Sequence, residues 1–407
     1  MELLFIQIVI IFSMKIQNIN YSLKNNKRVL SAQVILRSGK THDIYFEVDN
    51  KHIDLIAKDA SPFLAAALPI AMKKNEAIEI EGSTSKALMA NTPKIMKILQ
   101  SWDLGFDPVS ISANVLTKYF KKSKNVGCFF SGGVDSFYTY LKNKNKIDTL
   151  IFVHGFDIKV ADVKLYNKIE KNIIKIAKKE NIKLIKVKTN IREVFEQYFD
   201  WDMSHEFALA SVSLFLRNGF KEIFMSCGQT DNNAVHHYMS PELDVLWSTE
   251  KMKIHHFGCF AGKISKLAYL SHSPLVMRNL RVCWVNKKKE YNCCECEKCF
   301  RNMLALYVSD SLEKCVTFKK KLDLDKLESI RINEYVLKYF IAVLKALDQK
   351  NDRSKVRFAL ERCIENNTFP KFQQRLYRNS RDFIRYFDKK YNRNRLYWFM
   401  AQRDLIK

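Results

Sequence analysis

The chain has 407 residues, of which 47% are hydrophobic and 27% are charged. This length and composition are typical of a globular protein with two or three domains, and they exclude a disordered or fibrous chain. The formal net charge of +25 has two interpretations: a polyanionic partner such as tRNA or a nucleotide, or lysines spread over solvated helix faces. The scattered placement of the lysines favours the second interpretation.

The first segment of the chain, residues 1–13, is apolar. It is too short to span a bilayer, and it lacks the basic region and the cleavage site of a signal peptide. We interpret it as an extra strand or as an over-extended start with Met14 as the initiator; a weak signal anchor is the remaining alternative. The ten cysteines then favour a cytoplasmic, reducing location, no membrane association, and metal binding rather than disulfides.

Residues 1–120 are expected to form a small α+β region. Alternating apolar residues predict a hairpin of two strands, 29–36 and 41–48. Pro62 favours a helix over residues 61–72, and Pro93 favours a second helix that ends near Trp102. A short strand is predicted between these helices, at residues 77–80.

Residues 121–320 show alternating strands and helices, which is typical of an α/β domain with a doubly wound, mostly parallel sheet. The predicted strands are 126–130, 148–156, 183–188 and 222–227, and the main predicted helices are 161–180 and 204–216. Ligands of such sheets bind at the carboxyl ends of the strands. This rule brings residues 131–136, 154–157 and 228–231 to one rim. Residues 321–407 are predicted to be a basic, helical C-terminal region.

One of these rim segments, the sequence Ser-Gly-Gly-Val-Asp-Ser at residues 131–136, links a buried strand to the start of a helix. A glycine turn at a helix N-terminus is an anion site, because free N–H groups point outward and the helix dipole favours negative charge. The hydroxyls of Ser131 and Ser136 and the amides of Gly132 and Gly133 are expected to hold phosphate, and Asp135 is expected to hold Mg²⁺. The turn is too short for a Walker A loop.

This loop, which includes Val134, resembles the signature of the PP-loop, or N-type, ATP pyrophosphatase superfamily. The resemblance implies a PP-loop/HUP-like domain over residues 121–320 that splits ATP between the α and β phosphates. It also implies that adenine binds through main-chain contacts at Val153 and His154, at the end of the second strand.

A second motif consists of cysteines with the spacing Cys-x9-Cys-x2-Cys-x2-Cys: Cys283, Cys293, Cys296 and Cys299. Four thiolates can enclose Zn²⁺ tetrahedrally, and a closed site of this kind is structural. Cys294 is either a spare cysteine or the ligand in place of Cys293. An iron–sulfur cluster and redox-active cysteines used in sulfur transfer are the alternatives to zinc.

The two motifs in this order, over residues 124–306, resemble the family of 7-cyano-7-deazaguanine synthases. The resemblance implies ATP and pyrophosphate binding by residues 131–136 and structural zinc binding by the four cysteines. The gap after Cys283 is longer than that family's pattern, and residues 1–120 and the C-terminal tail have no counterpart in it.

Other polar residues are candidates for the same site. His205 begins a predicted helix and is expected to face phosphate, while Asp231 is expected to bind a second Mg²⁺ or to orient the acyl acceptor. Two pairs of adjacent histidines, at residues 236–237 and 255–256, suit acid/base chemistry or metal binding. Hydrogen-bonded structural histidines are nevertheless more common. Asp244 and Glu250 lie in a polar stretch that fits either a substrate loop or a capped helix.

The end of the chain is rich in arginine and aromatic residues. Such a segment can bind looped RNA, or it can form amphipathic helices that dock on the domain. The basic residues are Arg375, Arg378, Arg381, Arg385, Arg393 and Arg395.

The sequence therefore predicts an ATP-dependent adenylating enzyme, a ligase that activates a carboxylate or amide of a small molecule for attack by nitrogen. ATP-dependent thiolation of tRNA or of a small molecule is one alternative. A nucleotide-binding regulator or defence-system component without turnover is another. The sequence leaves open the acceptor, the nucleophile and whether the chain forms a homodimer.

Overall fold

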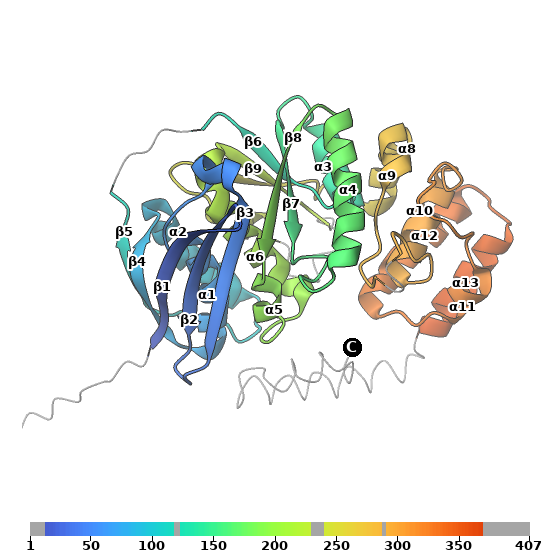
Figure 1. Ribbon diagram of the computed structural model, residues 1–407. Coiled ribbons are helices and arrows are strands. Elements are labelled where there is room, and N and C mark those ends of the chain that lie inside the picture. Colours follow the sequence, from blue (N-terminus) through green and yellow to red (C-terminus); the bar gives the residue numbers. More distant parts are fainter. Residues whose placement is uncertain (1–12, 118–122, 229–239, 287–289, 369–407) are drawn as a thin grey trace, which may run out of the picture.

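The computed structural model describes all residues except 1–12, 118–122, 229–239, 287–289 and 369–407. Within the described residues, ten strands form one sheet in the order β10-β9-β6-β7-β8-β3-β2-β1-β4-β5 (Figure 1). The strands are β1 (Ser13–Lys24), β2 (Lys27–Ile35), β3 (Thr41–Asp49), β4 (Ala77–Thr84), β5 (Ile111–Val115), β6 (Val126–Phe129), β7 (Thr149–His154), β8 (Lys183–Thr189), β9 (Glu222–Ser226) and β10 (Lys253–Phe257).

The sheet is mostly parallel, which confirms the predicted α/β class. The neighbours β10, β9, β6, β7 and β8 all run parallel, whereas β3, β2 and β1 join antiparallel. The sheet is continuous across the two halves, because Phe46 of β3 pairs with Thr189 of β8. The N-terminal strands thus extend the same sheet instead of forming a sheet of their own.

Helices cover both faces of the sheet. They are η1 (Asn50–Leu55), α1 (Ser61–Lys74), α2 (Lys86–Ser101), α3 (Val134–Lys142), α4 (Val163–Lys179), α5 (Ile191–Phe195), α6 (Trp201–Leu216), η2 (Arg217–Gly219), α7 (Pro241–Leu246), α8 (Lys263–Ser271), α9 (Pro274–Asn279), α10 (Glu297–Val308), α11 (Leu324–Ser329), α12 (Glu334–Gln349) and α13 (Lys355–Asn367). The helices α3 and α4 pack in one apolar cluster and α1, α5 and α6 in another, on opposite faces.

The amphipathic pattern of α4 shows why these helices form. Its buried residues Leu165, Ile169, Ile173 and Ile176 recur at helical spacing, and Asp162 caps its first turn by accepting a hydrogen bond from the N–H of Leu165. Two predicted helices begin earlier than expected. Ser85 caps α2, whereas Ser204 lies inside α6 and its hydroxyl donates to the carbonyl oxygen of Asp200.

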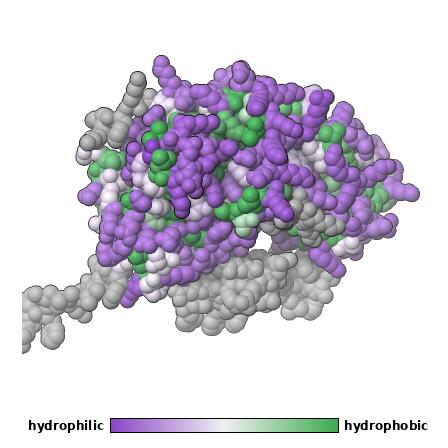
Figure 2. Space-filling view, viewed as in Figure 1, coloured by the Kyte–Doolittle hydropathy of each residue, from purple (hydrophilic) through white to green (hydrophobic). Residues whose placement is uncertain are grey.

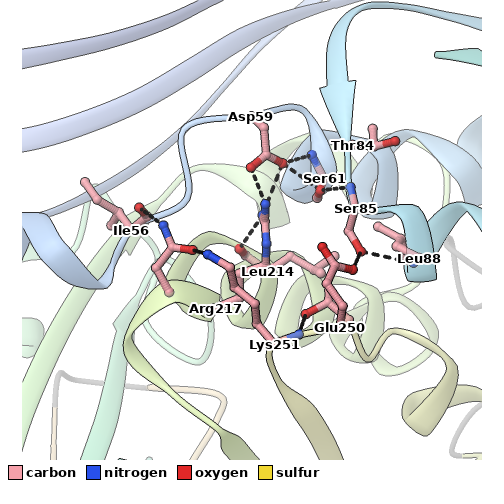
Figure 3. A network of polar contacts seen from close by, with 12 residues as sticks. Ile56, Asp59, Ser61, Thr84, Ser85, Leu88, Leu214, Arg217, Glu250 and Lys251 are labelled. Carbon is pink, nitrogen blue, oxygen red and sulfur yellow. Dashed lines mark hydrogen bonds and ion pairs between the residues drawn. The ribbon is translucent and has the colours of Figure 1, made fainter. Parts of the chain in front are cut away.

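A polar network, buried at Asp59 and Arg217, connects the two halves of the sheet (Figure 3). Arg217 forms an ion pair with Asp59, and the two side chains are only 2% and 8% exposed. Asp59 also accepts a hydrogen bond from the N–H of Ser61, at 3.0 Å. The hydroxyl of Ser85 donates to Glu250 at 2.6 Å. These bonds hold α1 and α2 against the segments that precede β9 and β10.

The helices α10–α13 form a third apolar cluster at one end of the molecule (orange in Figure 1). Of the predicted helical region 321–407, the described part contains α11, α12 and α13. The arginine-rich segment proposed to bind RNA lies beyond residue 368, outside the described residues.

Hydrophilic side chains dominate the face seen in Figure 2, and apolar residues are scattered over it in small groups. Among the described residues, no helix combines the length and the apolar character needed to cross a membrane.

Candidate functional site

The Ser-Gly-Gly loop lies at the point where the order of the parallel strands reverses. The chain passes from β6 to β7 and β8 on one side, then returns to place β9 on the other side of β6. Connections on the two sides of such a strand lead to opposite faces of the sheet and leave a crevice at the carboxyl end. The loop that follows β6 opens into that crevice.

The loop geometry suits an anion. Gly132 has φ of +77°, a left-handed conformation that favours glycine, and Gly133 is the N-cap of α3 without a side chain to satisfy its first amides. The Ser131 hydroxyl accepts a hydrogen bond from the N–H of Gly133 at 3.3 Å. The Ser136 hydroxyl donates to the carbonyl oxygen of Gly133 at 3.0 Å.

Asp135 forms ion pairs with two lysines of α8. Its carboxylate oxygens lie 2.6 Å from Lys263 Nζ and 2.9 Å from Lys266 Nζ. Burial acts to raise the pKa of Asp135, but the two ammonium groups outweigh it and hold this pKa well below its ordinary value. Burial also lowers the pKa of Lys263 to about 8, against the attraction of Asp135.

A cavity of about 280 Å³ lies beside the loop. Five basic side chains and three carboxylates from the described residues line it, so the lining is basic overall. The basic residues are Arg192, Lys263, Arg281, Lys298 and Arg301, and the carboxylates are Asp135, Asp157 and Asp202. A concave site with converging charged groups is the usual form of a small-molecule site, and this charge favours an anionic ligand.

The four predicted cysteines come together as a buried cluster. The sulfurs of Cys283 and Cys296 lie 4.0 Å apart and those of Cys293 and Cys299 lie 3.8 Å apart. All four sulfurs lie within 4.8 Å of one another. A tetrahedron with Zn–S bonds of about 2.3 Å has edges of about 3.8 Å, so the cluster fits a metal such as zinc. Cys294 is the spare cysteine, with φ of +59° and its sulfur 3.6 Å from the carbonyl oxygen of Asn292.

The cysteine segment is bonded directly to the loop. The N–H of Arg281 donates to the carbonyl oxygen of Gly132 at 2.9 Å, and Cys283, Lys298 and Arg301 line the cavity. Buried Asn292 holds this segment, because its side-chain oxygen accepts hydrogen bonds from the N–H groups of Val282 and Cys283. A metal at the cysteines would therefore fix one wall of the cavity.

The other predicted site residues are placed as follows. Val153 and His205 line the cavity. The His154 ring instead stacks on Tyr166, with ring centroids 3.8 Å apart, and its imidazole does not belong to the cavity lining described. Asp231 lies outside the described residues.

Lys263, Arg281 and Asn292 are site residues that sequence reasoning missed. A lysine after Gly262, an arginine before a valine and an asparagine before two cysteines carry no local signal for a site. Only the packing of α8 and of the cysteine segment against the loop brings them there. Glu250 and Asp244, suggested as a substrate loop, do not belong to the cavity lining of the described residues. Glu250 accepts a hydrogen bond from Ser85, and Asp244 lies in α7, which Ser240 caps.

Two further cysteines, Cys227 and Cys259, form a disulfide at the ends of β9 and β10. This differs from the expectation that the cysteines bind metal and form no disulfides. The pair is close to the loop, because Lys266 Nζ, which pairs with Asp135, also donates to the carbonyl oxygen of Cys227 at 2.6 Å.

Comparisons of the chain with protein-family models, with curated proteins and with solved structures found no match.

Proposed function

We propose that this chain is a PP-loop ATP pyrophosphatase, similar to 7-cyano-7-deazaguanine synthase, which adenylates a carboxylate or amide for attack by nitrogen. One observation carries the proposal: the Ser-Gly-Gly loop lies at the strand-order reversal, beside a basic cavity. An anion loop in this position suits the phosphates of a nucleotide.

In the proposed reaction, an oxygen of the substrate attacks the α phosphorus of ATP. The P–O bond to the β phosphate breaks, and pyrophosphate leaves with the electron pair. A nitrogen nucleophile then attacks the activated carbon, and AMP leaves. The loop amides and the side chains of Lys263 and Arg281 supply positive charge to the phosphates, so the protein contributes positioning and charge stabilisation.

The proposed role of Asp135 follows from its ion pairs. Both of its oxygens already contact lysines, which does not fit the expectation that it binds Mg²⁺. We therefore assign to Asp135 the positioning of Lys263 and Lys266, and we expect Mg²⁺ to enter with the phosphates. Zinc at the four cysteines would be structural, because four thiolates leave no open coordination position.

Pyrophosphate release tests the proposal. The full chain is mixed with ATP, Mg²⁺, ammonia and a set of small carboxylates that includes 7-carboxy-7-deazaguanine. We expect ATP-dependent release with at least one of them, and a loss of about 100-fold or more in Asp135→Ala. Asp54→Ala, which removes an exposed carboxylate outside the cavity lining, is the control. If Asp135→Ala releases pyrophosphate as fast as the wild type, the proposed ATP pyrophosphatase activity at this loop is refuted.

Thiolation is the second candidate, and the Cys227–Cys259 pair favours it because the pair lies beside the lysines that hold Asp135. A sulfur-transfer enzyme needs these thiols, whereas a nitrogen-transfer enzyme does not. The double variant Cys227→Ser/Cys259→Ser should keep its pyrophosphate release with ammonia under our proposal.

Tight ATP binding with no pyrophosphate from any substrate would instead indicate a nucleotide-binding regulator.

A further inference from the structure

Three side chains that are far apart in sequence meet on the face of the sheet opposite α3 and α4. Glu206 comes from α6, Asp244 from α7 and His256 from β10. One ligand atom from each of the three residues lies within 4.8 Å of the others. All three are buried: Glu206 is 3% exposed, and the side chains of Asp244 and His256 are each 1% exposed.

These side chains keep polar atoms that nothing in the described part of the chain satisfies. His256 Nδ1 bonds to Asp244 Oδ2. No hydrogen bond of the described residues reaches Glu206 Oε2, Asp244 Oδ1 or His256 Nε2. An ion held between these side chains would take Nδ1 of His256, which faces Asp244, and one oxygen from each carboxylate as its ligands.

The charge of the two carboxylates also favours a cation. Two carboxylates lie side by side, and no lysine or arginine among the described residues forms an ion pair with either of them. Burying such groups without a compensating charge is costly.

We propose that Glu206, Asp244 and His256 bind one divalent transition-metal ion of the Mn²⁺, Fe²⁺ or Zn²⁺ class, at a site separate from the four cysteines. Two carboxylate oxygens and one imidazole nitrogen are ligands that these ions accept. Three protein ligands leave a coordination position open, in contrast to the closed set of four thiolates. The proposed site does not depend on the ATP chemistry proposed above.

The Cys227–Cys259 disulfide borders this site. A sulfur from each cysteine lies within 4.8 Å of a ligand atom of His256. In the disulfide these sulfurs are not thiolates, but reduction would give a second group of ligand atoms that shares His256. A clean test therefore replaces both cysteines by serine, so that any metal retained must be held by the carboxylates and the imidazole.

The test measures the metal content of the full chain in the Cys227→Ser/Cys259→Ser background, after incubation with Zn²⁺ and Mn²⁺ and removal of the unbound ions. We expect two metal ions per chain. His256→Gln in the same background should retain only the ion at the four cysteines and should bind Mn²⁺ more than about 100-fold more weakly. His255→Gln is the matched control, because His255 stacks on Phe224 on the other face of β10 and should keep both ions.

A second variant provides a test that can be used if His256→Gln does not fold. Glu206→Gln/Asp244→Asn removes both negative charges with little change in shape, and it should also hold a single ion per chain. If the histidine variant does not fold, this variant is compared with its parent. Equal metal content in the parent and the folded variant, or only one ion per chain in the parent, overturns the proposal.

Discussion

The N–H of Arg281 donates a hydrogen bond to the carbonyl oxygen of Gly132, at 2.9 Å. This bond joins the segment that leads into the four cysteines to the loop that we propose holds phosphate. The two residues lie far apart in the chain, at positions 132 and 281. Any change that loosens the cysteine segment should therefore disturb the loop.

The first prediction concerns metal removal. Cys296→Ser should lose the ion at the four cysteines, lower the free energy of unfolding by about 3 kcal/mol or more and weaken ATP binding, because Arg281 and Lys298 would no longer be fixed. Metal analysis, thermal unfolding and calorimetry measure these effects. Cys294→Ser is the control and should keep its metal, since Cys294 does not belong to the cluster. Normal metal content in Cys296→Ser would contradict the assignment of the ligands.

The second prediction concerns Lys263. If this lysine contacts phosphate, Lys263→Met should weaken ATP binding by about 10- to 100-fold, because a hydrogen bond to a charged group is lost. Lys144→Met changes a lysine whose side chain is 51% exposed and pairs with Glu180, and it should bind ATP normally. Equal affinities for the two variants would place the phosphates elsewhere.

The third prediction concerns pH. Burial lowers the pKa of Lys263 to about 8, so its ammonium group is present below this pH and lost above it. ATP affinity should therefore fall as pH rises through about 8. Lys263→Arg should flatten this dependence, since arginine keeps its proton. Calorimetric titrations across neutral and alkaline pH measure it, and an unchanged slope in the arginine variant would exclude Lys263 as the titrating group.

The fourth prediction concerns the polar network of Figure 3. Asp59→Ala leaves Arg217 buried and charged without its partner, so it should lower the free energy of unfolding by about 3–5 kcal/mol. Urea unfolding followed by fluorescence measures this difference. Asp54→Ala removes an exposed carboxylate of the same segment and should change stability by less than about 0.5 kcal/mol. A similar loss in both variants would show that the ion pair has no special role.

Features that depend on neighbouring residues could be predicted from the sequence. An apolar strand, a Gly-Gly turn and a helix start are contiguous, and the last three cysteines of the cluster lie within seven residues, so their geometry follows from local spacing. The alternation of strands and helices indicated the α/β class for the same reason.

The contacts between distant residues became known from the folded structure. It paired β3 with β8 and so made one sheet, it brought Lys263 and Lys266 to Asp135, and it left Cys294 out of the metal cluster. It also gathered Glu206, Asp244 and His256 from three elements. These contacts depend on strand register and helix packing between segments far apart in the chain, which no local pattern of residues encodes.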